Sequence, residues 1–257
     1  MQLKFPIIPI RCNQIDVRLG VVDAKNEQVQ FPANTIPPAR VLEAKGPRLL
    51  PQVKLSELNH TLTQKSPEEI IAAAYALSDK VMTSTTFGHQ SAAILHMVTR
   101  VNPEATILWI DTGYNTSATY RFADNLIERL NLNIEIYAPK MTSTRRNVQM
   151  GGIPDVDDPL HEEFTRQVKL EPFERATRNM SPEIWITGVR REQTAFRQSL
   201  EIASRTNSGL LKVAPLLSWD QAQLDAYLLE HNLPNEADYF DPTKVSDTRE
   251  CGLQTRI

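Results

Sequence analysis

From residue 55 onward the chain alternates stretches of helical periodicity with short apolar runs. The strand-like runs lie at 80–84, 106–110, 133–137, 183–187 and 211–215, and the helix-like stretches at 66–77, 90–101, 117–130, 172–179 and 220–231. Strands separated by helices imply right-handed crossovers and a mostly parallel sheet with both faces covered. We therefore predict a doubly wound α/β domain over residues 55–235.

The two ends of the chain have a different character. Seven prolines interrupt the short apolar runs of residues 1–54, which predicts an N-terminal extension of short strands and irregular segments. Residues 236–257 have no strong periodicity and are predicted to form a mobile tail. Inside the domain we expect a polar, mobile stretch from 142 to 158.

Composition excludes several classes of protein. The net charge of -3 over 257 residues gives no general attraction to nucleic acid or membranes, so an anion site needs a local cluster of Arg and Lys. No stretch approaches the ~20 apolar residues of a membrane helix, and we read no signal peptide. Cys12 and Cys251 cannot form a four-cysteine zinc or iron–sulfur site on their own. We expect a cytoplasmic protein.

Cys251 is the most informative single residue. It lies near the C-terminus between Arg249 and Arg256, whose charges would favour the nucleophilic thiolate. A terminal segment can bring such a thiol into a cleft and withdraw it again. The alternative is a terminal cysteine without function, and the choice depends on whether the rest of the chain supplies a cleft.

Three polar segments follow predicted strands, where ligands bind to sheets of this kind. Residues 83–90 place four hydroxyls and a glycine before a helix. This pattern is typical of an anion-binding site, and also of an ordinary strand-to-helix turn with capping residues. The segment lacks the lysine of a phosphate-binding P-loop. Asp111 follows the second strand and could accept hydrogen bonds from a ribose or base, or cap a turn. Residues 187–197 carry Arg190, Arg191 and Arg197, which could bind phosphate or sulfate through bidentate contacts. The alternative is a run of charged residues exposed to solvent.

Together these segments resemble the phosphoadenylyl-sulfate (PAPS) reductase family, within the adenine nucleotide α-hydrolase-like folds. The motifs that carry the resemblance are Ser84-Thr85-Thr86-Phe87-Gly88-His89-Gln90, Asp111-Thr112-Gly113-Tyr114 with Thr119-Tyr120-Arg121-Phe122, Lys169-Leu170-Glu171-Pro172, Gly188-Val189-Arg190-Arg191-Glu192-Gln193 with Arg197, and Arg249-Glu250-Cys251-Gly252-Leu253. The similarity covers about residues 65–231 and resumes at the tail.

The resemblance implies thioredoxin-dependent reduction of PAPS to sulfite and adenosine 3′,5′-bisphosphate in sulfate assimilation, with Cys251 as the catalytic nucleophile and an S-sulfocysteine intermediate. The implied substrate contacts are Ser84, Thr85, Thr86, Phe87, Gly88, Gln90, Asp111, Gly113, Tyr114, Lys169, Gly188, Arg190, Arg191, Arg197 and Arg249. Asp111 and Gly113 would line the nucleoside side, and the cations would neutralise phosphate and sulfonyl oxygens.

The resemblance also implies no bound cofactor, thioredoxin or glutaredoxin as the electron donor, and a homodimer. Related adenylyl-sulfate (APS) reductases carry paired cysteines for an iron–sulfur cluster, and residues 163–173 contain none, which favours the cluster-free branch. Two features depart from the family pattern. Gln254 replaces a histidine, and the segment before Cys251 is shorter than the usual lid over the nucleotide.

Three alternatives stay open at this point. One is a cluster-free APS reductase, and a second is a nucleotide-binding paralogue without catalytic activity, which the shortened lid and Gln254 would suit. The third is an ATP-cleaving enzyme of the same fold, against which the missing S-G-G-x-D-S motif and the presence of Cys251 both argue.

Overall fold

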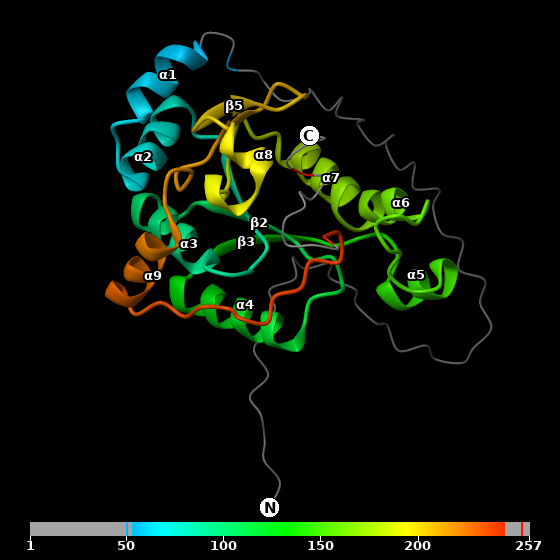
Figure 1. Cartoon of the computed structure of the whole chain (residues 1–257). Helices are drawn as coiled ribbons and strands as arrows, with labels where there is room; N and C mark the ends of the chain where they lie inside the picture. The colour runs from blue at the N-terminus through cyan, green and yellow to red at the C-terminus, as the bar shows by residue number, and fades with distance from the viewer. Residues whose placement is uncertain (1–49, 51–52, 245–252, 254–257) are drawn as a thin grey trace, which may run out of the picture. The chain divides into compact units, whose positions relative to one another are not determined.

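The structure, a computed structural model, describes residue 50, residues 53–244 and residue 253. The expected N-terminal extension falls almost wholly outside these residues, and so do Arg249 and Cys251. Within the described part of the chain, six strands form one sheet in the order β3-β2-β1-β4-β6-β5 (Figure 1). The strands are β1 (Val81–Thr85), β2 (Thr106–Ile110), β3 (Asn133–Tyr137), β4 (Ile184–Ile186), β5 (Ala203–Arg205) and β6 (Leu211–Val213).

The helices connect these strands in the alternating pattern that the sequence predicts. They are α1 (Leu55–Leu62), α2 (Pro67–Leu77), α3 (Ser91–Val101), α4 (Ser117–Leu130), α5 (Ser143–Met150), α6 (His161–Thr165), α7 (Glu171–Met180), α8 (Ala195–Gln198) and α9 (Gln221–Glu230), with a π-helical turn η1 (Arg166–Leu170) and a 3-10 turn η2 (Arg191–Gln193). All neighbouring strands are parallel except β5 and β6, which are antiparallel. The mostly parallel doubly wound fold is therefore confirmed.

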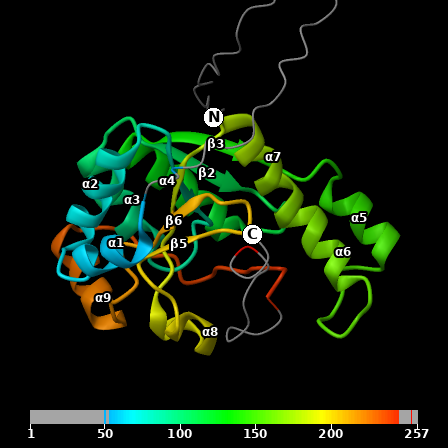
Figure 2. The same cartoon turned by 90° about the horizontal axis from the view of Figure 1, so that it is seen from above.

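Successive strand residues point to opposite faces of the sheet, so each strand supplies two separate cores. In β4, Ile184 and Ile186 pack with α1, α2, α3, α4 and α9, whereas Trp185 packs with α7. Figure 2 shows the same division of helices between the two faces. Burial on both faces explains the continuous apolar sequences of β2 and β4, Ile107–Ile110 and Ile184–Ile186.

Local signals in the sequence account for several element boundaries. Ser66 and Glu69 form a reciprocal capping box at the start of α2, with Pro67 in the first helical position. The polar stretch 142–158, which we expected to be mobile, contains α5. This helix begins after Thr142, whose hydroxyl accepts a hydrogen bond from the Arg145 amide, and ends at Gly151 with a φ of 75°.

The direction of chain crossover reverses at the centre of the sheet. The connections from β1 through β2 to β3 run one way, and β4 then pairs with the opposite edge of β1. Ligands of doubly wound sheets bind outside the carboxyl ends of the strands at such a reversal. The segments that follow β1 and β4 are therefore the expected place for a site.

Candidate active site

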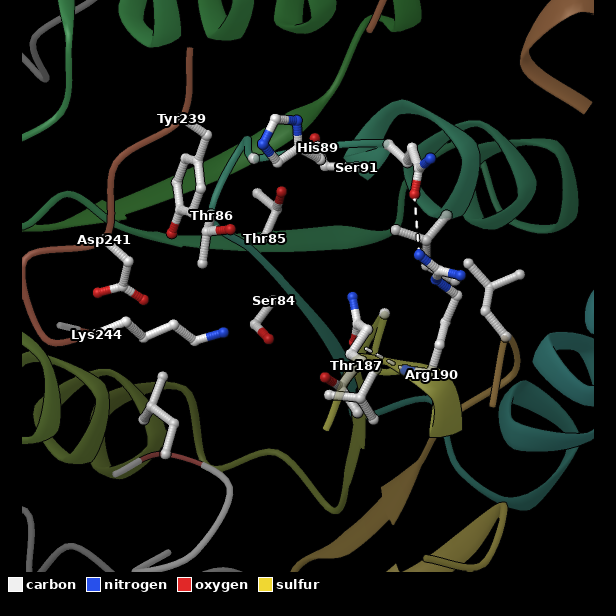
Figure 3. A pocket seen from close by; sticks show the side chains of 18 of the residues that line it. Ser84, Thr85, Thr86, His89, Ser91, Thr187, Arg190, Tyr239, Asp241 and Lys244 are labelled. Atoms are coloured by element: carbon white, nitrogen blue, oxygen red, sulfur yellow. Dashed lines mark hydrogen bonds between the residues drawn. The ribbon is translucent and has the colours of Figure 1, made fainter. Parts of the chain in front are cut away.

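A cavity of about 320 Å³ lies at this reversal point. Its walls come from the loop after β1, the loop after β4, the π-helical turn η1 and the segment that follows α9. Figure 3 shows Tyr239 and Asp241 on one side of the cavity and Arg190 on the other, with Ser84, Thr85 and Thr86 between them. The site thus combines residues from four distant parts of the sequence.

Nine of the residues expected to contact the substrate line this cavity. They are Ser84, Thr85, Thr86, Gly88, Gln90, Lys169, Gly188, Arg190 and Arg197. The structure therefore brings together the hydroxyl-rich loop, the buried lysine and two of the three arginines of the expected arginine cluster. Arg249 and Cys251 lie outside the described residues.

The loop after β1 has an unusual backbone. Phe87 and Gln90 adopt positive φ values of 51° and 62°, in the left-handed region that bulky side chains rarely occupy. Thr85 supports this shape because its hydroxyl accepts a hydrogen bond from the Phe87 amide at 3.1 Å. The backbone turn exposes Thr85, Thr86 and Gly88 to the cavity at the start of α3.

Phe87 itself does not line the cavity. Its side chain is fully buried, and its ring packs edge-on against Trp109 of β2 with centroids 4.9 Å apart. This packing fixes the left-handed turn of the loop. The side chain of Phe87 therefore has a structural role in holding the loop.

Arg190 links the walls of the cavity. Its guanidinium is buried and donates hydrogen bonds to the Oε1 atoms of Gln90, at 3.1 Å, and Gln221, at 3.2 Å. Glu192 forms an ion pair with the same guanidinium. Gln90 in turn donates to Asp225 of α9. Because these contacts join the loop after β1, the loop after β4 and α9, Arg190 presents a positive charge in a fixed orientation.

Arg191 points away from the cavity. Its side chain is exposed and donates to the carbonyl oxygen of Leu200 at 3.2 and 3.3 Å. Arg197, six residues further along in α8, is buried, lines the cavity and hydrogen bonds to Gln193. The paired arginines of the sequence are thus separated by the backbone turn, and only the first of them joins Arg197 at the site.

Asp111, Gly113 and Tyr114 are also absent from the cavity wall among the described residues. Asp111 accepts hydrogen bonds from the Tyr120 hydroxyl at 2.8 Å and the Asn115 amide at 3.0 Å. Burial, together with this hydrogen bond and the charge of Asp111, raises the pKa of Tyr120 to about 12. The Tyr114 hydroxyl donates to Asn147 at 2.7 Å. These residues organise the turn after β2.

Seven polar residues of the wall were not among the expected substrate contacts, namely His89, Ser91, Thr187, Gln193, Tyr239, Asp241 and Lys244. The Ser91 hydroxyl has no hydrogen-bond partner among the described residues, although it is shielded from solvent. Asp241 and Lys244 come from the segment after α9, which carries no helical or strand pattern in the sequence. Leu253, two residues after Cys251, is buried in the same wall against Leu170 and Trp185.

The cavity suits an anion with several charged groups. Four cations line it (Lys169, Arg190, Arg197 and Lys244), together with hydroxyls and the start of α3. No group of three or more His, Cys, Asp or Glu side chains is placed to hold a metal ion within the part of the chain that the structure describes. None of the described helices is long and apolar enough to cross a membrane. The fold and site define a doubly wound α/β protein with a polyanion pocket at the switch point of its sheet.

Comparison with known proteins narrows this class. The family model for the phosphoadenosine phosphosulfate reductase domain matches residues 80–240. A phosphoadenosine 5′-phosphosulfate reductase of a Synechococcus strain is 38% identical over 192 residues, which cover 73% of this chain and 81% of the relative. The corresponding protein of Proteus mirabilis is 33% identical, with 71% and 75% covered. The chain belongs to the phosphoadenosine phosphosulfate reductase family.

A solved structure agrees with this assignment. The crystal structure of a PAPS reductase from Candida auris, a phosphate complex, matches with a TM-score of 0.61 and 27% identity. The match covers 71% of this chain and 87% of that one. The adenine nucleotide α-hydrolase-like fold expected from the sequence is therefore confirmed.

Proposed function

We propose that this chain reduces 3′-phosphoadenylyl sulfate to sulfite and adenosine 3′,5′-bisphosphate in sulfate assimilation. Family membership supports the reaction, and the relatives named above carry this activity in their names. The observation in this chain that carries the proposal is the position of Leu253 in the wall of the four-cation cavity. Leu253 follows Cys251 by two residues in the sequence, within the tail motif that is expected to carry the nucleophile.

In the first step, the Cys251 thiolate attacks the sulfur atom of the substrate's sulfate group. A bond forms between the two sulfur atoms, and the bond from that sulfur to the bridging phosphate oxygen breaks. Adenosine 3′,5′-bisphosphate leaves with the electron pair, and Cys251 becomes S-sulfocysteine. Lys169, Arg190, Arg197 and Lys244 stabilise the negative charge on the leaving phosphate and the sulfonyl oxygens.

In the second step, a thiolate of thioredoxin attacks the Cys251 sulfur and releases sulfite with the electron pair. The resulting mixed disulfide is resolved by the second thioredoxin thiol, which returns Cys251 to its reduced form and leaves oxidised thioredoxin. Two electrons from the dithiol thus reduce the sulfate sulfur to sulfite. Glutaredoxin is the other dithiol donor that the chemistry accommodates.

Further properties follow from the same proposal. The reaction needs no bound cofactor, so the purified protein should show no visible absorption from an iron–sulfur cluster. We also propose a homodimer in the cytoplasm, which light scattering after size-exclusion chromatography and cell fractionation would test. These expectations rest on the family and on the cysteine count of the chain.

The direct test is sulfite release from PAPS with reduced thioredoxin, and the same assay with APS. We expect sulfite with PAPS and none after Cys251→Ser, whereas Cys12→Ser should retain the activity. Faster turnover of APS would assign the chain to the cluster-free APS reductases. Nucleotide binding without sulfite from either substrate would identify a non-catalytic paralogue.

A further inference from the structure

Asp241 is an unexpected residue for an anion pocket. Among the described residues that line the cavity, four are cationic and Asp241 alone carries a carboxylate. Its side chain is almost fully buried, and so is that of Lys169, with exposures of 6% and 3%. A carboxylate at this position opposes an anionic ligand unless its charge is already compensated within the protein.

The compensation comes from Lys169. Its ammonium nitrogen lies 2.5 Å from Asp241 Oδ2. The second carboxylate oxygen, Oδ1, accepts hydrogen bonds from the Thr243 hydroxyl at 2.7 Å and from the Thr243 amide at 3.0 Å. The two carboxylate oxygens therefore have different partners, because Oδ2 pairs with Lys169 and Oδ1 is bound by Thr243.

Asp241 is ionised at neutral pH. Burial by itself would raise the pKa of Asp241, but the charge of Lys169 and the hydrogen bonds from Lys169 and Thr243 outweigh burial and lower this pKa. An ionised Asp241 thus occupies the coordination position on Lys169 that an incoming sulfate or phosphate oxygen would take.

We propose that Asp241 is an internal counter-ion, which the anionic groups of the nucleotide displace from Lys169 during binding. This inference rests on the proposed function. Before the ligand arrives, Asp241 compensates a lysine charge that would be costly to bury alone. After the exchange, its Oδ1 atom keeps the two hydrogen bonds from Thr243, so the carboxylate does not lose all its partners. Asp241 is therefore a positioning residue that acts through Lys169.

The exchange also links ligand binding to the segment after α9. Asp241 lies on the same short segment as Tyr239 and Lys244, both of which line the cavity. The Lys244 amide donates to the Asp241 carbonyl oxygen at 3.0 Å. When Asp241 releases Lys169, this wall of the cavity can adjust around the nucleotide. Lys244 moves with the same segment.

The test measures binding of PAPS by calorimetry in a Cys251→Ser background, where the substrate cannot react. Adding Asp241→Asn removes the competing charge, so we expect the dissociation constant to fall about ten-fold. In the otherwise unmodified chain, Asp241→Asn should lower KM without raising kcat. A carboxylate with only a structural role predicts the opposite sign, because its loss would disorder the site and weaken binding.

Asp238→Asn is the matched control, since Asp238 is an exposed carboxylate on the same segment that does not line the cavity. It should change the dissociation constant less than two-fold. An unchanged or raised constant in folded Asp241→Asn would overturn the proposal.

Because Asp241→Asn could fail to fold, a second measurement keeps Asp241. In a crystal structure of the Cys251→Ser chain with PAPS, Lys169 should contact a ligand oxygen and no longer pair with Asp241. A retained Lys169–Asp241 pair would overturn the proposal. Sulfite release by the unmodified chain separates this outcome from a failure of the proposed function, because the reaction can be correct while the exchange is wrong.

Discussion

The aromatic ring of Tyr239 packs directly on Gly88. A Cβ atom added to Gly88 would come within 2.9 Å of Tyr239 Cδ1, closer than such atoms approach in real proteins. The contact joins the loop after β1 to the segment after α9, and both line the cavity. Glycine at position 88 is therefore required by the close approach of a neighbouring ring.

The first prediction concerns this contact. Gly88→Ala should lower the free energy of unfolding by about 1–3 kcal/mol, because the added methyl group overpacks the site. Urea denaturation measures this loss. In a Tyr239→Ala background the ring is gone, so the same change at Gly88 should cost much less. An equal cost in both backgrounds would show that the ring is not the cause.

The second prediction concerns the Ser91 hydroxyl, which lines the cavity and has no hydrogen-bond partner among the described residues. Ser91→Ala should leave the free energy of unfolding within about 0.5 kcal/mol, because removing a hydroxyl without a protein partner breaks no hydrogen bond. The dissociation constant for adenosine 3′,5′-bisphosphate should rise by about five-fold, the effect of one lost hydrogen bond. Ser117→Ala, an exposed serine at the start of α4, should change neither quantity. Unaltered binding after Ser91→Ala would remove this hydroxyl from the site.

The third prediction separates the paired arginines. Arg190→Lys keeps the charge but loses the guanidinium nitrogen Nη2, which donates to both Gln90 and Gln221. We expect about ten-fold weaker binding of adenosine 3′,5′-bisphosphate and a loss of about 1–3 kcal/mol in the free energy of unfolding. Arg191→Lys is the matched control, because the Arg191 side chain donates to the Leu200 carbonyl oxygen and does not line the cavity. The dissociation constant of Arg191→Lys for adenosine 3′,5′-bisphosphate should stay within about two-fold of that of the unmodified chain. Equal losses from both changes would contradict the geometry.

The fourth prediction is a pH dependence of stability. Burial, together with the nearby charges of His231 and Arg100, lowers the pKa of His96, whose Nδ1 lies 2.9 Å from the Tyr227 hydroxyl. The unfolded chain therefore binds a proton at this histidine more readily than the folded chain does. The free energy of unfolding should fall as the pH drops below the ordinary histidine value of about 6.5.

Urea denaturation at pH 7.5 and pH 5.5 measures this slope. His96→Gln removes the titrating group, so its stability should fall less over the same interval. A slope that is identical in both proteins would show that His96 is not responsible. His96 and Tyr227 connect α3 with α9. The result bears on the site because Gln90 and Asp225 connect the same two helices near the cavity.

Much of the fold could be predicted because its signals are local. The strands at 106–110 and 133–137 and the helix at 117–130 agree with the structure at both ends. Periodicity and capping determine these boundaries. By contrast, the three-residue strand β5 and the turn η1 depend on tertiary packing, which no local pattern in the chain reveals.

The residues of the site were likewise predicted only in part. The motifs identified the loops after β1 and β4, but sequence proximity could not show that Arg190 and Arg191 point apart. Phe87 was expected at the ligand, whereas its buried contact with Trp109 makes it part of the core. Asp241 was missed because its partner Lys169 is 72 residues away, and only the folded chain brings the two charges together.

The measurement that tests the central claim most directly is the intact mass of the reduced protein after mixing with PAPS in the absence of thioredoxin. The covalent mechanism predicts a mass increase of one sulfonate group on Cys251, its absence after Cys251→Ser, and its removal when reduced thioredoxin is added. No adduct with either PAPS or APS, in a protein that still binds the nucleotide, would contradict the reductase mechanism.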